Sequence, residues 1–96
     1  MQAIGRVEAA ERIATIAEKA SPDDLTMIFE ELFPTDTPPS GGPKAAELAL
    51  YIRTGIEPEL VVDLWNLLFP DSRVEYYDEE SETLRYRVED PRYAGR

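Results

Sequence analysis

The chain of 96 residues contains no cysteine and no histidine. The absence of cysteine excludes disulfides, thiolate catalysis and cysteine-ligated zinc. The absence of histidine removes the commonest general base and metal ligand of proteins. The serines therefore have no imidazole to activate them. We expect no catalytic residue, no bound cofactor and no metal site.

Long apolar runs are also missing from the sequence. No segment approaches the roughly 20 apolar residues that a membrane span needs. Residues 1–20 carry charged side chains throughout, unlike the apolar region of a signal peptide. These two features predict a cytoplasmic protein that makes no contact with a membrane.

Basic residues are scarce, because ten Lys and Arg stand against twenty Asp and Glu, which gives a formal net charge of −10. Residues 21–42 contain five acidic side chains and no basic one. This sign repels the phosphates of nucleic acids and favours partners with a basic surface. The same charge also keeps a small protein in solution, so it does not by itself establish a binding function.

An internal repeat is the most informative pattern in the chain. Residues 8–35 and 44–71 align without a gap at an offset of 36, and Leu-Phe-Pro recurs at the end of both segments. Similarity at a fixed period is typical of a supersecondary unit that buries its apolar face against a copy of itself. We therefore expect two tandem helical hairpins that form a four-helix body.

Apolar periodicity and helix-end signals define these helices. Ser21 and Pro22 indicate a helix start, because serine is a good N-cap and proline suits the first helical position. Pro34 and Pro70 end their helices, since the residue before a proline is disfavoured in helical geometry. The predicted helices cover residues 4–20, 22–33, 44–54 and 58–69.

The C-terminal part of the chain changes from a helical to an alternating apolar pattern. This change predicts an antiparallel β-hairpin with strands over residues 72–77 and 83–89. The chain is thus expected to be a single domain over 1–89, of the α+β class and mainly α, with a flexible tail over 90–96.

Side-chain alternation also predicts the register of this hairpin. With Tyr76 opposite Leu84 and Val74 opposite Tyr86, every apolar side chain lies on one face and opposite charges pair on the other. A two-stranded ribbon is marginal in water, so the apolar face must pack against the helices or another sheet.

The fourth helix is the most apolar segment of the chain. Its apolar side chains cover about 220° of the helical wheel, which is wider than the stripe that a surface helix needs. Such a helix is either central to the fold or shared with a second molecule. The same two alternatives stay open for Trp65.

We interpret the chain as a non-catalytic protein–protein interaction module, that is, a small acidic regulatory, adaptor or assembly protein. The expected partner is another protein with a basic or an apolar surface, and homodimerisation through the fourth helix or the hairpin is the specific form of this hypothesis. Aromatic, apolar and arginine side chains are the types that anchor interfaces. The partner-binding residues proposed on this ground are Val62, Leu67, Phe69, Tyr77, Arg85 and Arg87.

An acidic mimic of nucleic acid is the alternative interpretation. Such an inhibitor would occupy the basic site of a nucleic-acid-binding protein, and it needs carboxylates in rows at phosphate-like spacing. The candidate acidic surface consists of Glu30, Glu31, Asp78, Glu79 and Glu80.

A winged-helix-like DNA-binding protein is the third interpretation, because helices precede a hairpin in the chain. In that outline the fourth helix would read the bases, yet it carries no lysine or arginine. The tip of the hairpin is acidic as well, so both elements carry the same sign of charge as the DNA phosphates and would repel them.

Overall fold

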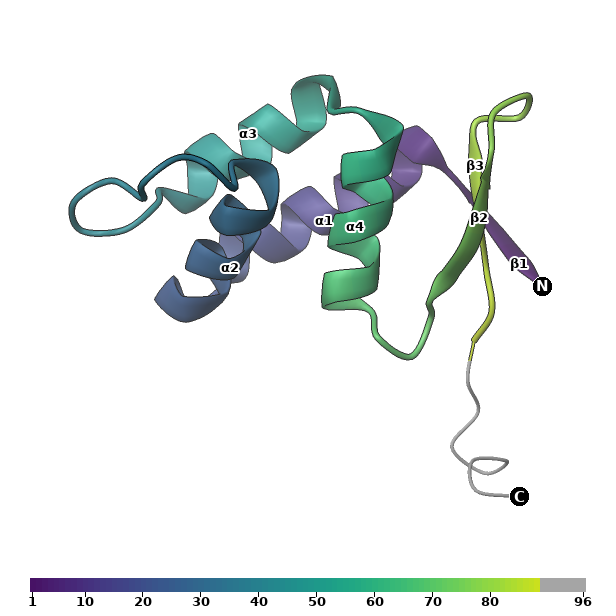
Figure 1. The fold of residues 1–96 in the computed structure, drawn as a ribbon, viewed down its shortest axis with the longest axis horizontal. Coiled ribbons are helices and arrows are strands. Elements are labelled where there is room, and N and C mark those ends of the chain that lie inside the picture. Colours follow the sequence, from purple (N-terminus) through teal and green to yellow (C-terminus); the bar gives the residue numbers. More distant parts are fainter. Residues whose placement is uncertain (89–96) are drawn as a thin grey trace, which may run out of the picture.

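The computed structural model describes residues 1–88 and shows a mainly helical α+β protein. Within these residues, four helices form one part of the molecule and a three-stranded sheet forms the other (Figure 1). The predicted class is confirmed, with one strand more than expected. In chain order the elements are β1 (Gln2–Gly5), α1 (Arg6–Lys19), α2 (Pro22–Leu32), α3 (Ala45–Gly55), α4 (Pro58–Leu68), β2 (Val74–Asp78) and β3 (Thr83–Tyr86).

The helix ends follow local sequence signals. The Ser21 side chain caps α2 by accepting a hydrogen bond of 3.2 Å from the backbone N–H of Asp24. Phe33 and Phe69 end α2 and α4 in non-helical conformations, with φ of −132° and −125°. Gly55 ends α3 at φ 111°, in the left-handed region that favours glycine. The last three predicted helices are therefore correct to within one residue at each end.

No helix in the described part of the chain is long and apolar enough to cross a membrane.

The first strand corrects the prediction of a helix over 4–20. Residues Gln2–Gly5 form β1, and α1 begins only at Arg6. Ile4, which is buried, lies opposite Leu84 of β3. The pattern was ambiguous because one buried residue at the start of the segment fits both a helical and a strand period.

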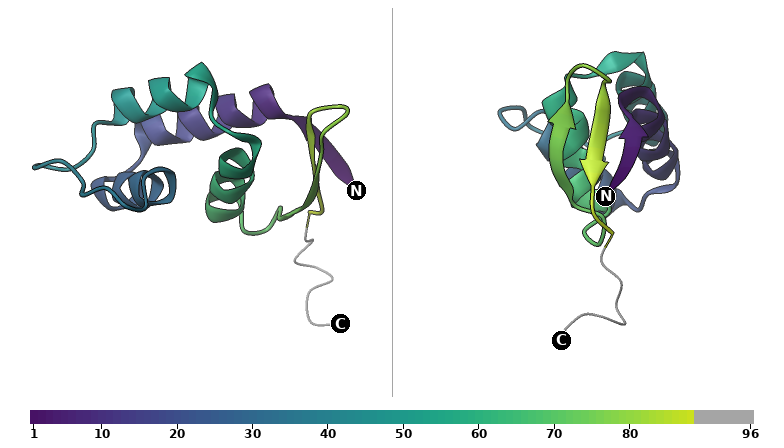
Figure 2. Two further views of the ribbon diagram at one scale, coloured as in Figure 1. Left: turned by 45° about the horizontal axis from the view of Figure 1, so that its top comes forward. Right: turned by 90° about the vertical axis from the view of Figure 1, so that its right-hand side faces the viewer.

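The sheet has the strand order β1-β3-β2, and both pairings are antiparallel (Figure 2). The two predicted strands are present with other limits, since β2 covers Val74–Asp78 and β3 covers Thr83–Tyr86. The predicted tail over 90–96 and the last residue of the predicted second strand lie outside the described residues.

The register of β2 against β3 is only half as predicted. Val74 lies opposite Tyr86, as expected, but Leu84 lies opposite Tyr77 instead of Tyr76. A β-bulge between Val74 and Tyr76 adds one residue to β2 and moves every later side chain to the other face. Tyr76 is consequently 53% exposed, whereas Tyr77 is half-buried.

α1 and α3 run antiparallel along each other and make the most extensive contact between two elements (Figure 2). Arg53 of α3 joins the two helices, because its guanidinium donates to Glu11 Oε1 and Oε2 at 3.0 and 2.9 Å and also to Glu18. The hydrogen bonds with Arg53 lower the pKa of Glu11. Small side chains allow the close approach, since four of the five buried residues of α1 are Ala9, Ala10, Ala14 and Ala17.

α4 is central to the fold. It packs on α1 and α2 and also on β2, and it stands between the other helices and the sheet (Figure 1). Trp65 is only 2% exposed, and its ring lies 4.3 Å from Phe69 and 5.3 Å from Tyr86, between ring centroids. Trp65 is therefore a core residue. The other apolar residues of α4 are buried or partly buried against the core: Leu60, Val61, Val62, Leu64, Leu67 and Leu68.

Candidate functional site

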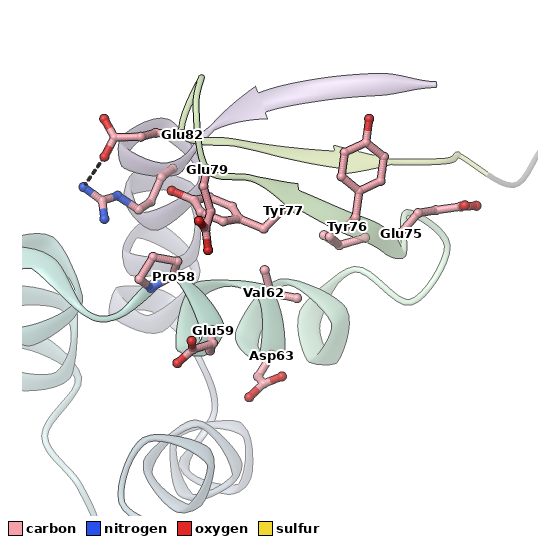
Figure 3. A pocket seen from close by; sticks show the side chains of 11 residues that line it. Pro58, Glu59, Val62, Asp63, Glu75, Tyr76, Tyr77, Glu79 and Glu82 are labelled. Carbon is pink, nitrogen blue, oxygen red and sulfur yellow. Dashed lines mark ion pairs between the residues drawn. The ribbon is translucent and has the colours of Figure 1, made fainter.

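An open groove of about 530 Å³ lies between the N-terminal half of α4 and strand β2 (Figure 3). Val62 points from α4 toward the sheet, and Tyr77 approaches from β2. Together with Val74 they supply apolar surface inside the groove. Such a mixture of apolar surface and surrounding charge is typical of surfaces that bind another molecule.

The helix wall of the groove follows from the amphipathic character of α4. Val61, Leu64 and Trp65 turn to the core. Glu59 and Asp63 are one helical turn apart, so they share a face. Both residues line the groove at its outer side, and their carboxylates point away from the sheet (Figure 3).

The strand wall is held in place by two hydrogen bonds from the end of α4. Trp65 Nε1 donates to the carbonyl oxygen of Ser72 at 2.7 Å. Asn66 Oδ1 accepts a hydrogen bond of 2.8 Å from the backbone N–H of Val74. Both bonds attach the start of β2 to α4, and they therefore define where the groove begins.

The groove is strongly acidic. One of its carboxylates, Glu82, pairs with Arg6 at 3.0 Å, and another, Glu75, pairs with Arg87 at 3.2 Å. The remaining carboxylates of the groove make no ion pair within residues 1–88, and they are those of Glu59, Asp63 and Glu79. The groove therefore favours a positively charged occupant.

Three residues predicted from the sequence meet in this groove. Val62 and Tyr77, proposed as partner-binding residues, lie there with Glu79 from the proposed acidic surface. Glu59 and Asp63 were not among the site residues predicted from the sequence. Their spacing of four residues on an otherwise apolar helix was the available signal.

Other predicted residues lie away from the groove. Leu67 lines a separate open depression of about 610 Å³, together with Glu30 and Glu31. The Phe69 ring packs at a tilted angle against the buried Trp65, with ring centroids 4.3 Å apart. The prediction thus joined residues that the fold places at different sites.

The predicted residues of the hairpin tip make local interactions. Asp78 accepts hydrogen bonds from the backbone N–H of Glu80 at 3.1 Å and of Ser81 at 3.4 Å, and it pairs with Arg85 at 3.4 Å. The pKa of Asp78 is lowered most by hydrogen bonds from Ser81, of which the side-chain bond has the larger effect and the backbone bond the smaller one. The backbone hydrogen bond from Glu80 and the charge of Arg85 lower this pKa further. Asp78 therefore shapes the turn, whereas the side chain of Glu80 is exposed.

The acidic side chains of the groove are spread along it. Among the described residues, no group of three or more is placed to hold a metal ion. Comparison of the chain with protein families, with characterised proteins and with solved structures gives no match. The geometry of the groove is therefore the basis for assigning a function.

Proposed function

We propose that this protein is a non-catalytic protein–protein interaction module that binds a basic segment of another protein in the groove between α4 and β2. The observation that carries the proposal is that three carboxylates with no ion pair within residues 1–88, those of Glu59, Asp63 and Glu79, line the same groove as the apolar side chains of Val62 and Tyr77.

Lysine and arginine suit such a surface for a physical reason. Their aliphatic stems bury against apolar side chains while their charged ends stay hydrated or meet carboxylates. Val62 and Tyr77 supply the apolar contact, and a long side chain that extends past Val62 over α4 would meet Glu59 and Asp63 on the outer side of this helix. Charge complementarity of this kind mainly increases the association rate and the specificity.

The size of the groove limits the occupant. A volume of about 530 Å³ accommodates a few side chains and not the face of a folded domain. Interfaces this small are weak and transient. A short segment of a partner, in a regulatory or adaptor interaction, fits this description.

The test measures binding of a fluorescently labelled seven-residue peptide in which lysine and valine alternate, at about 0.15 M salt. We expect the variant Glu59→Gln/Asp63→Asn to bind the peptide about tenfold more weakly, because each partly exposed ion pair contributes up to about 1 kcal/mol. The peptide should also compete with a lysine-rich segment of any natural partner.

The matched control is Glu30→Gln/Glu31→Gln, which removes two charges from the other depression. We expect it to bind within about twofold of the wild type, because distant surface charges are screened at this salt concentration. Equal losses in both variants would mean that net charge, and not the groove, attracts the peptide. Absence of binding to the wild-type protein would overturn the proposal.

We also propose that the two halves of the helical body are copies of one unit. α2 and α4 both have 11 residues, and both carry a proline in the first turn. Both end at a phenylalanine in nearly the same backbone conformation. Only the second copy lies beside β2, so the groove is a property of that copy alone.

An acidic mimic of nucleic acid is a second candidate. It is favoured by the other acidic depression, where Asp36 adds a third carboxylate to those of Glu30 and Glu31. The variant in which all five residues of the proposed acidic surface are neutralised should then fail to displace duplex DNA from a basic DNA-binding protein. Displacement equal to that of the wild type would exclude the mimic.

Homodimerisation stays a prediction of the sequence. The partly buried side chains of α4 pack against the core, which reduces the apolar surface that α4 can offer a second copy. Light scattering at high micromolar concentration measures the mass directly, and a monomeric mass would exclude a homodimer under those conditions.

A further inference from the structure

The backbone of β3 bonds to both neighbouring strands in alternation. The N–H of Arg6, just after β1, donates to Glu82 O at 2.8 Å, and the N–H of Arg87 donates to Arg73 O, just before β2, at 3.2 Å. Neighbouring residues of a strand direct their backbone groups to opposite sides. The even-numbered residues of β3 therefore bond toward β1 and the odd-numbered ones toward β2.

This alternation shows which backbone groups of β2 are directed away from β3. Asp78 and Tyr76 lie opposite Thr83 and Arg85, so their backbone groups face β3. Tyr77, between them, consequently directs its N–H and C=O to the outer edge of the sheet. β2 is an edge strand, because the strand order within the described residues is β1-β3-β2.

The outer edge of β2 faces the groove. Val74 also directs its N–H outward, and this N–H bonds to Asn66 Oδ1 of α4 at 2.8 Å. Val74 and Tyr77 both line the groove. Asn66 thus closes the edge at one end, and further along the backbone groups of Tyr77 form a pairing position that no strand among residues 1–88 occupies.

We infer that the basic segment enters the groove as an extended strand and pairs with the backbone of Tyr77 at the edge of β2. This inference rests on the proposed function. Strand addition supplies main-chain hydrogen bonds for affinity, while alternate side chains provide specificity. Because side chains alternate along a strand, lysine or arginine at every second position would reach the carboxylates of Glu59 and Asp63 on the α4 side.

The opposite edge of the sheet is less suited to this partner. β1 carries the uncharged sequence Gln-Ala-Ile-Gly, and it does not line the acidic groove. The bulge and the bond to Asn66 also limit pairing on β2 to its C-terminal half. A segment that pairs over only a few residues agrees with a weak and reversible interaction.

The test uses backbone N-methylation of the alternating lysine–valine peptide, which removes N–H donors and leaves the side chains unchanged. One peptide is methylated at two central lysines and the other at two central valines. In a strand, these two sets of N–H groups point to opposite edges. We expect one peptide to bind about tenfold more weakly, since hydrogen bonds are lost, and the other to bind within about twofold of the parent.

A second readout reports on the protein itself. Saturation with the parent peptide should slow hydrogen exchange of the Tyr77 amide by at least about tenfold, whereas the Tyr76 amide, which already faces β3, should change little. Equal effects of the two methylated peptides, or an unchanged Tyr77 amide, would overturn strand addition. The proposed function would survive that result if the parent peptide still required Glu59 and Asp63, and it would fail if the parent peptide did not bind.

Discussion

The indole Nε1 of Trp65 donates a hydrogen bond of 2.7 Å to the backbone carbonyl of Ser72, which joins the core of the helical body to the segment that leads into the sheet. Trp65 is the only tryptophan of the chain and is 2% exposed. A buried carbonyl without a partner is costly. The bond therefore explains why an otherwise apolar position carries a residue with a polar group.

The first prediction concerns this bond. The substitution Trp65→Phe removes the donor and part of the buried volume, and we expect it to lower the free energy of unfolding by about 1–3 kcal/mol. Urea denaturation followed by far-ultraviolet circular dichroism measures this change. The control Tyr76→Phe alters an exposed aromatic residue and should change stability by less than about 0.5 kcal/mol. Equal stability of wild type and Trp65→Phe would contradict the assigned role.

The second prediction concerns Asn66, which caps the edge of β2 at Val74. Asn66→Ala should lower stability by about 1 kcal/mol and accelerate hydrogen exchange of the Val74 amide, because this N–H loses its acceptor. Asn66→Asp keeps an acceptor oxygen and should retain the slow exchange. Unchanged exchange in the alanine variant would show that Asn66 does not protect the edge.

The limits of the last three helices were predictable from the sequence because their signals are local. Ser21, Gly55 and the prolines act within a few residues of their own positions. The register of the hairpin was not predictable in this way. Tyr76 and Tyr77 are identical neighbours, so alternation alone cannot decide which of them faces Leu84, and the bulge selects Tyr77.

The groove was not predictable from the sequence for a different reason. Its carboxylates come from α4 and from the hairpin, which are separated in the chain and meet only after the sheet packs on the helices. Val62 and Tyr77 were selected as residue types that favour interfaces. The position of Glu59 and Asp63 beside the groove became evident only from the structure.

The third prediction concerns pH. Arg53 lowers the pKa of Glu11, so the folded state binds a proton at this site less readily than the unfolded state. The stabilisation by this pair is present above the ordinary glutamate pKa of 4.5 and is lost as the pH falls through the lower folded-state value. Wild type should therefore be more stable than Glu11→Gln at neutral pH, and the difference should shrink under acid conditions.

Thermal unfolding of both proteins from pH 7 to pH 3 measures this difference. Glu8→Gln is the matched control on the same helix, because within residues 1–88 Glu8 pairs only with Arg12 of its own helix, at 3.3 Å. Its stability difference from the wild type should be small throughout. A difference between wild type and Glu11→Gln that stays constant down to pH 3 would contradict the pairing with Arg53.

The fourth prediction separates stability from binding at Asp63. Glu59 and Asp63 are like charges one turn apart, which destabilises a helix, and Asp63→Lys replaces this repulsion by an attractive pair in the favoured orientation. We expect stability to rise by about 0.5–1 kcal/mol, while the alternating lysine–valine peptide binds at least about tenfold more weakly.

Glu31→Lys makes the same change of charge in the other depression and should leave peptide binding within about twofold of the wild type. A gain in stability accompanied by a loss of binding indicates that the repulsion is retained for recognition. Undiminished binding by Asp63→Lys would instead show that the rim of α4 does not contact the peptide.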